Sequence, residues 1–112
     1  MHADQGQERR RAPRIKLFQP AEMACGTSDP ARVHLLNVSL SGALVYGDAA
    51  PAVGEEIRID CGVPLAPARV AWRSGRRFGV AFTYPLAPAQ LDALVQAQDA
   101  LFAAARERMG VG

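Results

Sequence analysis

The sequence predicts one all-β domain, a small sandwich or barrel of six strands, followed by a single C-terminal amphipathic helix. Between Ile15 and Thr83, short apolar stretches alternate with turn residues, the spacing expected of such folds. Apolar residues at helical spacing begin only after Pro85. The length of 112 residues fits one domain, and 49% apolar with 21% charged residues is typical of a globular protein.

The N-terminal segment is expected to be a tail, because residues 1–8 contain no apolar anchor. The domain itself is expected to span residues 9–109. No apolar run of transmembrane length occurs, and the first residues lack the apolar stretch of a signal peptide. These features predict a cytoplasmic protein without a membrane span.

Six strands are predicted, with bounds that periodicity fixes only to within a few residues. They cover residues 14–23, 32–38, 43–47, 55–60, 66–73 and 77–83. Alternation in three of them predicts which side chains face the core: Ile57 and Ile59, Val70 and Trp72, and Phe78, Val80 and Phe82. Alternation therefore favours a core or barrel-end position for Trp72 over contact with a ligand.

The C-terminal helix is predicted over residues 88–109. Pro88 suits a first helical turn, and Gly110 is a typical stop signal. The apolar stripe of this helix must be covered, either by the barrel or by a second copy of the chain. We expect the barrel to cover it, because a small barrel needs additional buried area. The oligomeric state stays open between a monomer and a weak dimer.

Catalytic and metal-binding patterns are not found in the sequence. There is no Walker loop, HExxH or GxSxG motif, and neither His2 nor His34 is close in sequence to a candidate nucleophile. Cys25 and Cys61 form no CxxC pair, so we expect two reduced, buried thiols. We therefore expect no enzyme activity, no metal site and no cofactor.

The basic residues are concentrated near the N-terminus. The net charge is only +2, yet five of the thirteen basic residues lie within residues 9–16. Pro13 favours an extended backbone, in which Arg10 and Arg14 lie on one side about 13 Å apart, while Arg9 and Arg11 alternate to the other side. Guanidinium groups suit phosphates and the O6/N7 edge of guanine. The segment is either an anion-binding element or a solvated basic leader.

A second cluster of polar residues lies between the second and third predicted strands, in the sequence NVSLSG. Asn37 and Ser39 offer hydrogen-bonding groups at alternating positions, and Gly42 permits a close approach of a flat ligand. The alternative is an ordinary Asx-type turn in a hairpin.

Taken together, in this order and spacing, the two clusters resemble the PilZ domain family, whose signature is RxxxR followed by [DN]xSxxG. Arg10 and Arg14 match the first motif, and Asn37, Ser39 and Gly42 match the second. The resemblance covers roughly residues 8–109. It implies a six-stranded antiparallel β-barrel that binds cyclic di-GMP through these five residues and passes the signal to a protein partner.

The resemblance also implies details of the ligand. Arg9, directly before RxxxR, implies two mutually intercalated cyclic di-GMP molecules per domain. Arg11 and Trp72 are candidates for additional contacts. We further expect residues 9–14 to become ordered against the barrel when the phosphates arrive.

Three alternatives to this interpretation are distinguishable. A PilZ-like adaptor would use the barrel only for protein contacts, but both motifs are complete. A single-stranded nucleic-acid binder would need several exposed aromatic residues on one strand face, which alternation does not predict. An enzyme acting on cyclic dinucleotides would need metal ligands or a general base near the motifs, and the sequence offers neither.

Overall fold

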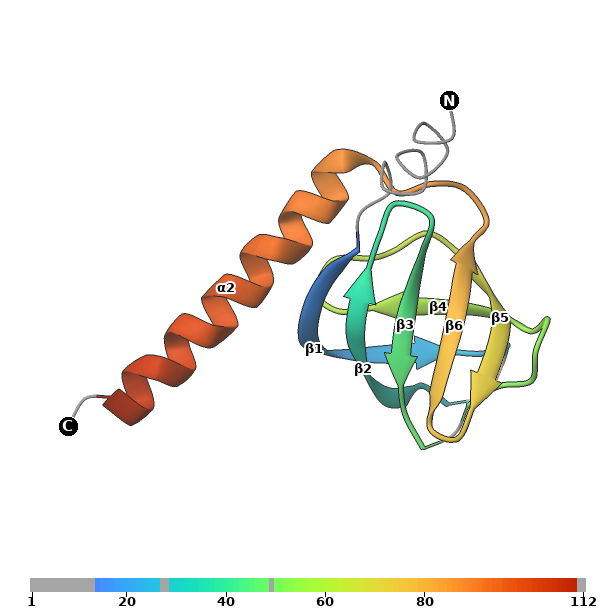
Figure 1. Cartoon of the computed structure of the whole chain (residues 1–112), viewed down its shortest axis with the longest axis horizontal. Coiled ribbons are helices and arrows are strands. Elements are labelled where there is room, and N and C mark those ends of the chain that lie inside the picture. The colour runs from blue at the N-terminus through green and yellow to red at the C-terminus, as the bar shows by residue number, and fades with distance from the viewer. Residues whose placement is uncertain (1–13, 27–28, 49, 111–112) are drawn as a thin grey trace, which may run out of the picture.

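The computed structural model describes residues 14–26, 29–48 and 50–110, and it contains a closed β-barrel followed by one long helix (Figure 1). The elements are β1 (Ile15–Ala24), β2 (Ala31–Val38), β3 (Gly42–Tyr46), β4 (Glu56–Asp60), β5 (Ala68–Ser74), β6 (Arg77–Phe82) and α2 (Pro88–Gly110). The predicted six strands and C-terminal helix are confirmed, and the predicted bounds differ from these by at most two residues.

The strands follow the order β1-β2-β3-β6-β5-β4 around the barrel, and β4 closes it by pairing with β1. All neighbouring strands are antiparallel. Closure leaves the sheet with no free edge. The strands β2, β3, β6 and β5 are consecutive neighbours in this order and therefore form one continuous face of the barrel.

The interior of the barrel contains the apolar side chains that alternation predicted. Ile57, Ile59, Phe78 and Val80 are buried, and Phe82 is 9% exposed. The residues between them on the same strands point outwards, as the pleat of a strand requires. Burial of these side chains on one face of each strand is what fixes the register of the barrel.

The prediction that Trp72 lies on the core face with Val70 is wrong. Val70 pairs with Val80, but Trp72 pairs with Gly79, so β5 contains one extra residue, Ala71, relative to β6. This β-bulge reverses the alternation, because an inserted residue turns every following side chain to the other face. Trp72 is 46% exposed on the outside of the barrel.

The helix α2 is anchored to the barrel at its N-terminal half. Gln90 Oε1 accepts a hydrogen bond from Ala87 N–H (2.8 Å), half of a capping box, and Gln90 Nε2 donates to the Pro64 carbonyl (3.1 Å). Leu94 is completely buried. Gln98 Oε1 accepts the backbone N–H of Phe18 (3.1 Å), which lies where the β1–β2 register shifts.

The expectation that the barrel covers the whole apolar stripe of the helix is correct only for this N-terminal half. Leu101 and Phe102 are 38% and 46% exposed. Figure 1 shows the C-terminal half of α2 pointing away from the barrel. The reason is geometric, because a helix of this length extends beyond the barrel wall that it packs against.

The two cysteines differ from each other, and the expectation of two buried thiols holds only for Cys61. Burial raises the pKa of the Cys61 thiol. The half-buried Cys25 donates its thiol hydrogen to Glu55 Oε2 (2.7 Å), which raises the pKa of Cys25 and lowers that of Glu55.

Among the residues that the structure describes, there is no helix with the length and apolar composition that crossing a membrane requires.

Candidate ligand-binding site

The start of β1 and the end of β2 bring the two polar clusters together. Antiparallel pairing places Ile15 opposite Val38 and Lys16 opposite Asn37. Arg14, directly before β1, is thereby next to Asn37, and its Nη1 donates a hydrogen bond to Asn37 Oδ1 at 3.1 Å. The last residue of RxxxR and the first residue of NxSxxG are therefore in direct contact, although 23 residues separate them in the sequence.

Ser39 forms the turn between β2 and β3. Its Oγ accepts hydrogen bonds from the backbone N–H of Ser41 (3.2 Å) and of Gly42 (3.3 Å), and its own N–H donates to the Gly42 carbonyl (2.8 Å). Ser39 is only 4% exposed. The Ser39 hydroxyl thus accepts hydrogen bonds from backbone N–H groups that a tight turn would otherwise leave without a partner. Ser41 is exposed and is the serine of this turn that faces solvent.

Gly42 allows β3 to approach β6 closely. It pairs with Ala81, and a Cβ atom at this position would overlap the carbonyl oxygen of Val80. The obstacle is backbone within the sheet, which cannot rotate away as a side chain could. The absence of a side chain is therefore required by the packing of two strands in the barrel.

These residues form one side of a pocket of about 590 Å³ on the outer face of the barrel. Its lining residues come from the residue before β1, from β2, β3, β5 and β6, and from the turn between β2 and β3. They are Arg14, Asn37, Ser39, Ser41, Gly42, Ala43, Leu44, Ala71, Trp72, Arg77, Gly79, Val80 and Ala81. Two of these are arginines and none is acidic. The pocket therefore favours an anionic ligand.

The opposite side of the pocket is formed by the Trp72 indole. Trp72 lies so close over Gly79 that a Cβ atom at Gly79 would overlap the indole Nε1. A large aromatic side chain that covers a glycine on the neighbouring strand is a known way of stabilising a sheet. Here the same arrangement places a half-exposed aromatic ring across the pocket from Arg14.

Four of the predicted ligand-binding residues are thus neighbours: Arg14, Asn37, Ser39 and Gly42. Trp72, predicted as an additional contact, lines the same pocket. Arg9, Arg10 and Arg11 lie outside the described residues.

Sequence reasoning missed Ser41, Gly79 and Arg77 as pocket residues. The signal that could have found the last two is the alternation in β6, which places Arg77 and Gly79 on the face opposite Phe78 and Val80. The neighbouring Arg76 is occupied elsewhere. It donates to the Tyr46 hydroxyl (3.3 Å) and approaches Asp48 (3.4 Å), and both contacts raise its pKa.

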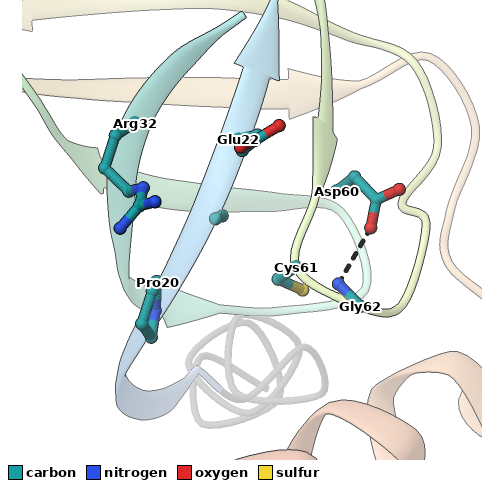
Figure 2. Close-up of a pocket in the computed structure, with 7 residues that line it drawn as sticks. Pro20, Glu22, Arg32, Asp60, Cys61 and Gly62 are labelled. Atoms are coloured by element: carbon teal, nitrogen blue, oxygen red, sulfur yellow. Dashed lines mark hydrogen bonds between the residues drawn. The ribbon is translucent and has the colours of Figure 1, made fainter.

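A second depression of about 460 Å³ lies between β1, β2 and the end of β4, and its lining includes neither Arg14 nor a residue of the second motif. Figure 2 shows Glu22 and Asp60 there beside a single arginine, Arg32. Asp60 Oδ1 already accepts the backbone N–H of Gly62 (2.8 Å) and caps the turn after β4. The mixed charge of this depression favours an anion less than the first pocket does.

The side chains of the pocket with the motifs offer several kinds of contact to a ligand. Among the described residues that line this pocket there is no His, Cys, Asp or Glu. The arginine side chains supply planar donors, Asn37 supplies an amide, and Trp72 supplies a flat apolar surface. These groups suit a ligand that combines phosphates with aromatic bases.

Comparison with known proteins agrees with this geometry. The model of the PilZ domain matches residues 8–97, which include both motifs, all six strands and the start of α2. The match ends before residue 109, where the resemblance was expected to end. Comparison with curated proteins found no match. The chain belongs to the PilZ domain family.

Proposed function

We propose that the pocket between Arg14 and Trp72 binds cyclic di-GMP and that the chain is a non-catalytic receptor which relays this signal to a protein partner. The PilZ family is in general a family of receptors for this nucleotide. The observation that carries the proposal is the hydrogen bond between Arg14 and Asn37, because it joins the two motifs at the edge of a pocket whose described lining residues include no carboxylate. A cytoplasmic location and a downstream partner are part of the same proposal.

The proposed roles of the arginines follow from the ligand's chemistry. Cyclic di-GMP offers two phosphates and two guanines, and a guanidinium group binds either of these with paired hydrogen bonds. Asn37 holds the Arg14 side chain at the pocket before any ligand arrives, which reduces the ordering cost of binding. The expectation that residues 9–14 become ordered on binding therefore does not fit Arg14, and residues 9–13 lie outside the described residues. Arg9 and Arg10 supply the remaining cations in this proposal.

The residues of the second motif have different proposed roles. Asn37 presents its amide to the guanine, as the family resemblance implies. Ser39 and Gly42 support the site by shaping the turn and the β3–β6 contact, which supports a positioning role for both. Ser41, exposed beside them, is an additional hydroxyl within reach of a ligand in the pocket.

Isothermal titration of cyclic di-GMP into the full chain tests the proposal and gives the stoichiometry. We expect a dissociation constant in the micromolar range or tighter, about −8 kcal/mol or more favourable. Arg9 predicts two ligands per chain. One ligand per chain would refute the intercalated pair alone, whereas no heat with cyclic di-GMP would refute the receptor and favour a PilZ-like adaptor.

Replacing the indole tests its contact with the ligand. We expect Trp72→Ala to weaken cyclic di-GMP binding by about 10-fold, because stacking of one base on an aromatic side chain contributes about 1–3 kcal/mol. Trp72→Phe, which retains a flat ring, is the matched control and is expected to lose less. Equal affinity of Trp72→Ala and wild type in the same titration would exclude the indole from the binding site.

A further inference from the structure

The C-terminal half of α2 carries an apolar surface that the barrel does not cover. Gln98, where the helix lies on β1, is only 7% exposed, whereas Leu101 and Phe102 in the next turn are 38% and 46% exposed. Figure 1 shows this half of the helix away from the barrel. The PilZ domain match ends at residue 97, so the uncovered half lies beyond the matched part of the chain.

Charged residues flank this apolar surface in a specific pattern. Asp99 precedes Phe102 by three residues and Arg106 follows it by four, so all three lie on the same face of the helix. Asp99 and Arg106 are two turns apart, about 10 Å along the axis, which is too far for an ion pair within one helix. Among the described residues, the ion pair is between Arg76 and Asp48 and involves neither Asp99 nor Arg106.

This pattern is complementary to itself when two helices run antiparallel. A two-fold axis between positions 102 and 103 brings Asp99 of each copy opposite Arg106 of the other. The two Phe102 rings then meet at the axis and bury each other. A parallel pair would instead place Asp99 opposite Asp99 and Arg106 opposite Arg106, so the charges select the antiparallel arrangement.

We propose that the C-terminal half of α2 is the interface of a weak antiparallel homodimer, held by Phe102 and by two Asp99–Arg106 pairs between the copies. The pairing is limited to about three turns of each helix, because β1 covers the face around Gln98. An interface of this size is expected to be weak.

The dimer leaves the ligand pocket free. None of the described residues that line the pocket belongs to α2. Each dimer would therefore present two open pockets and two barrels, joined through their helices. Dimerisation is thus independent of the proposed nucleotide binding, and the two properties are separable by mutation.

Sedimentation equilibrium of the full chain tests the interface, at loadings from about 10 µM to about 500 µM, a range that covers weak complexes. We expect the average mass of the wild type to rise from monomer towards dimer over this range. Phe102→Lys is expected to stay monomeric throughout while keeping wild-type helicity by circular dichroism and wild-type cyclic di-GMP titration. A wild type that is monomeric at the highest loading would overturn the proposal and leave the surface to a different protein.

A charge exchange tests the orientation. Asp99→Arg is expected to weaken the dimer by at least about 10-fold, because the new cation faces Arg106 of the other copy twice per dimer. The double variant Asp99→Arg/Arg106→Asp reverses both charges and is expected to restore the wild-type dissociation constant. Failure of this double variant to recover, or a dimer unaffected by Asp99→Arg, would contradict the antiparallel pairing.

Discussion

The double variant Arg10→Ala/Arg14→Ala is expected to bind cyclic di-GMP at least about 100-fold more weakly than the wild type. Each hydrogen bond to a charged group contributes about 1.5–3 kcal/mol, so two arginines account for about 3–6 kcal/mol of binding free energy. Each 1.4 kcal/mol corresponds to a factor of ten in the dissociation constant. Loss of Arg14 also frees the Asn37 amide, which then no longer has a fixed orientation at the pocket. Titration calorimetry measures the loss directly.

The matched control for this experiment is Arg32→Ala/Arg58→Ala. Both residues are exposed on the barrel and outside the pocket with the motifs, and their removal changes the net charge by the same amount. We expect this control to bind as the wild type does, apart from a small general electrostatic effect that salt screens. Equal losses in the two double variants would mean that the overall charge, and not a specific site, attracts the nucleotide.

Gly42→Ala is expected to lower the free energy of unfolding by about 1–3 kcal/mol, the usual cost of overpacking a well-packed region. The added methyl group would overlap the Val80 carbonyl oxygen, and relief requires β3 and β6 to separate along their shared ladder. The measurement is urea denaturation followed by far-ultraviolet circular dichroism. The predicted effect is on the barrel itself, in addition to any effect on ligand affinity.

Ser41→Ala is the control in the same turn. Ser41 is exposed and its backbone N–H bonds to Ser39 in either variant. The change therefore removes only the long contact between the two serine hydroxyls (3.3 Å), and we expect it to alter stability by less than about 0.5 kcal/mol. If Gly42→Ala unfolds at the same urea concentration as the wild type, the close β3–β6 contact does not constrain this position, and a ligand-contact role for Gly42 becomes the better explanation of the motif.

The extent to which the sequence predicted the fold depended on local regularity. Strands β4 and β6 alternate without interruption, and their core residues were predicted correctly from Ile57 and Phe78 onwards. Trp72 was misplaced because a β-bulge adds one residue without any change in composition, and Ala71 looks like an ordinary strand residue. The closed barrel came from the family resemblance, since periodicity alone does not distinguish a barrel from a sandwich.

The sequence grouped Arg14, Asn37, Ser39 and Gly42, which line one pocket in the structure, but it did not give their roles. The resemblance grouped Arg14 with Asn37, and the β1–β2 register explains their contact. Ser39 and Gly42 are equally suited to a ligand contact and to a tight turn, so residue type could not separate these roles. The hydrogen bonds of the Ser39 hydroxyl and the close approach of Val80 to Gly42 depend on the folded structure, so the spacing of residues in the sequence does not predict them.

The position of Trp72 has a practical consequence for spectroscopy. It is the only tryptophan among the 112 residues, and it lies half-exposed at the candidate pocket. Intrinsic fluorescence of the unlabelled protein therefore reports on this one face of the barrel, and quenching by an added nucleotide would be a local signal. The same emission is a poor measure of unfolding, because the indole is already partly in water while the barrel is intact.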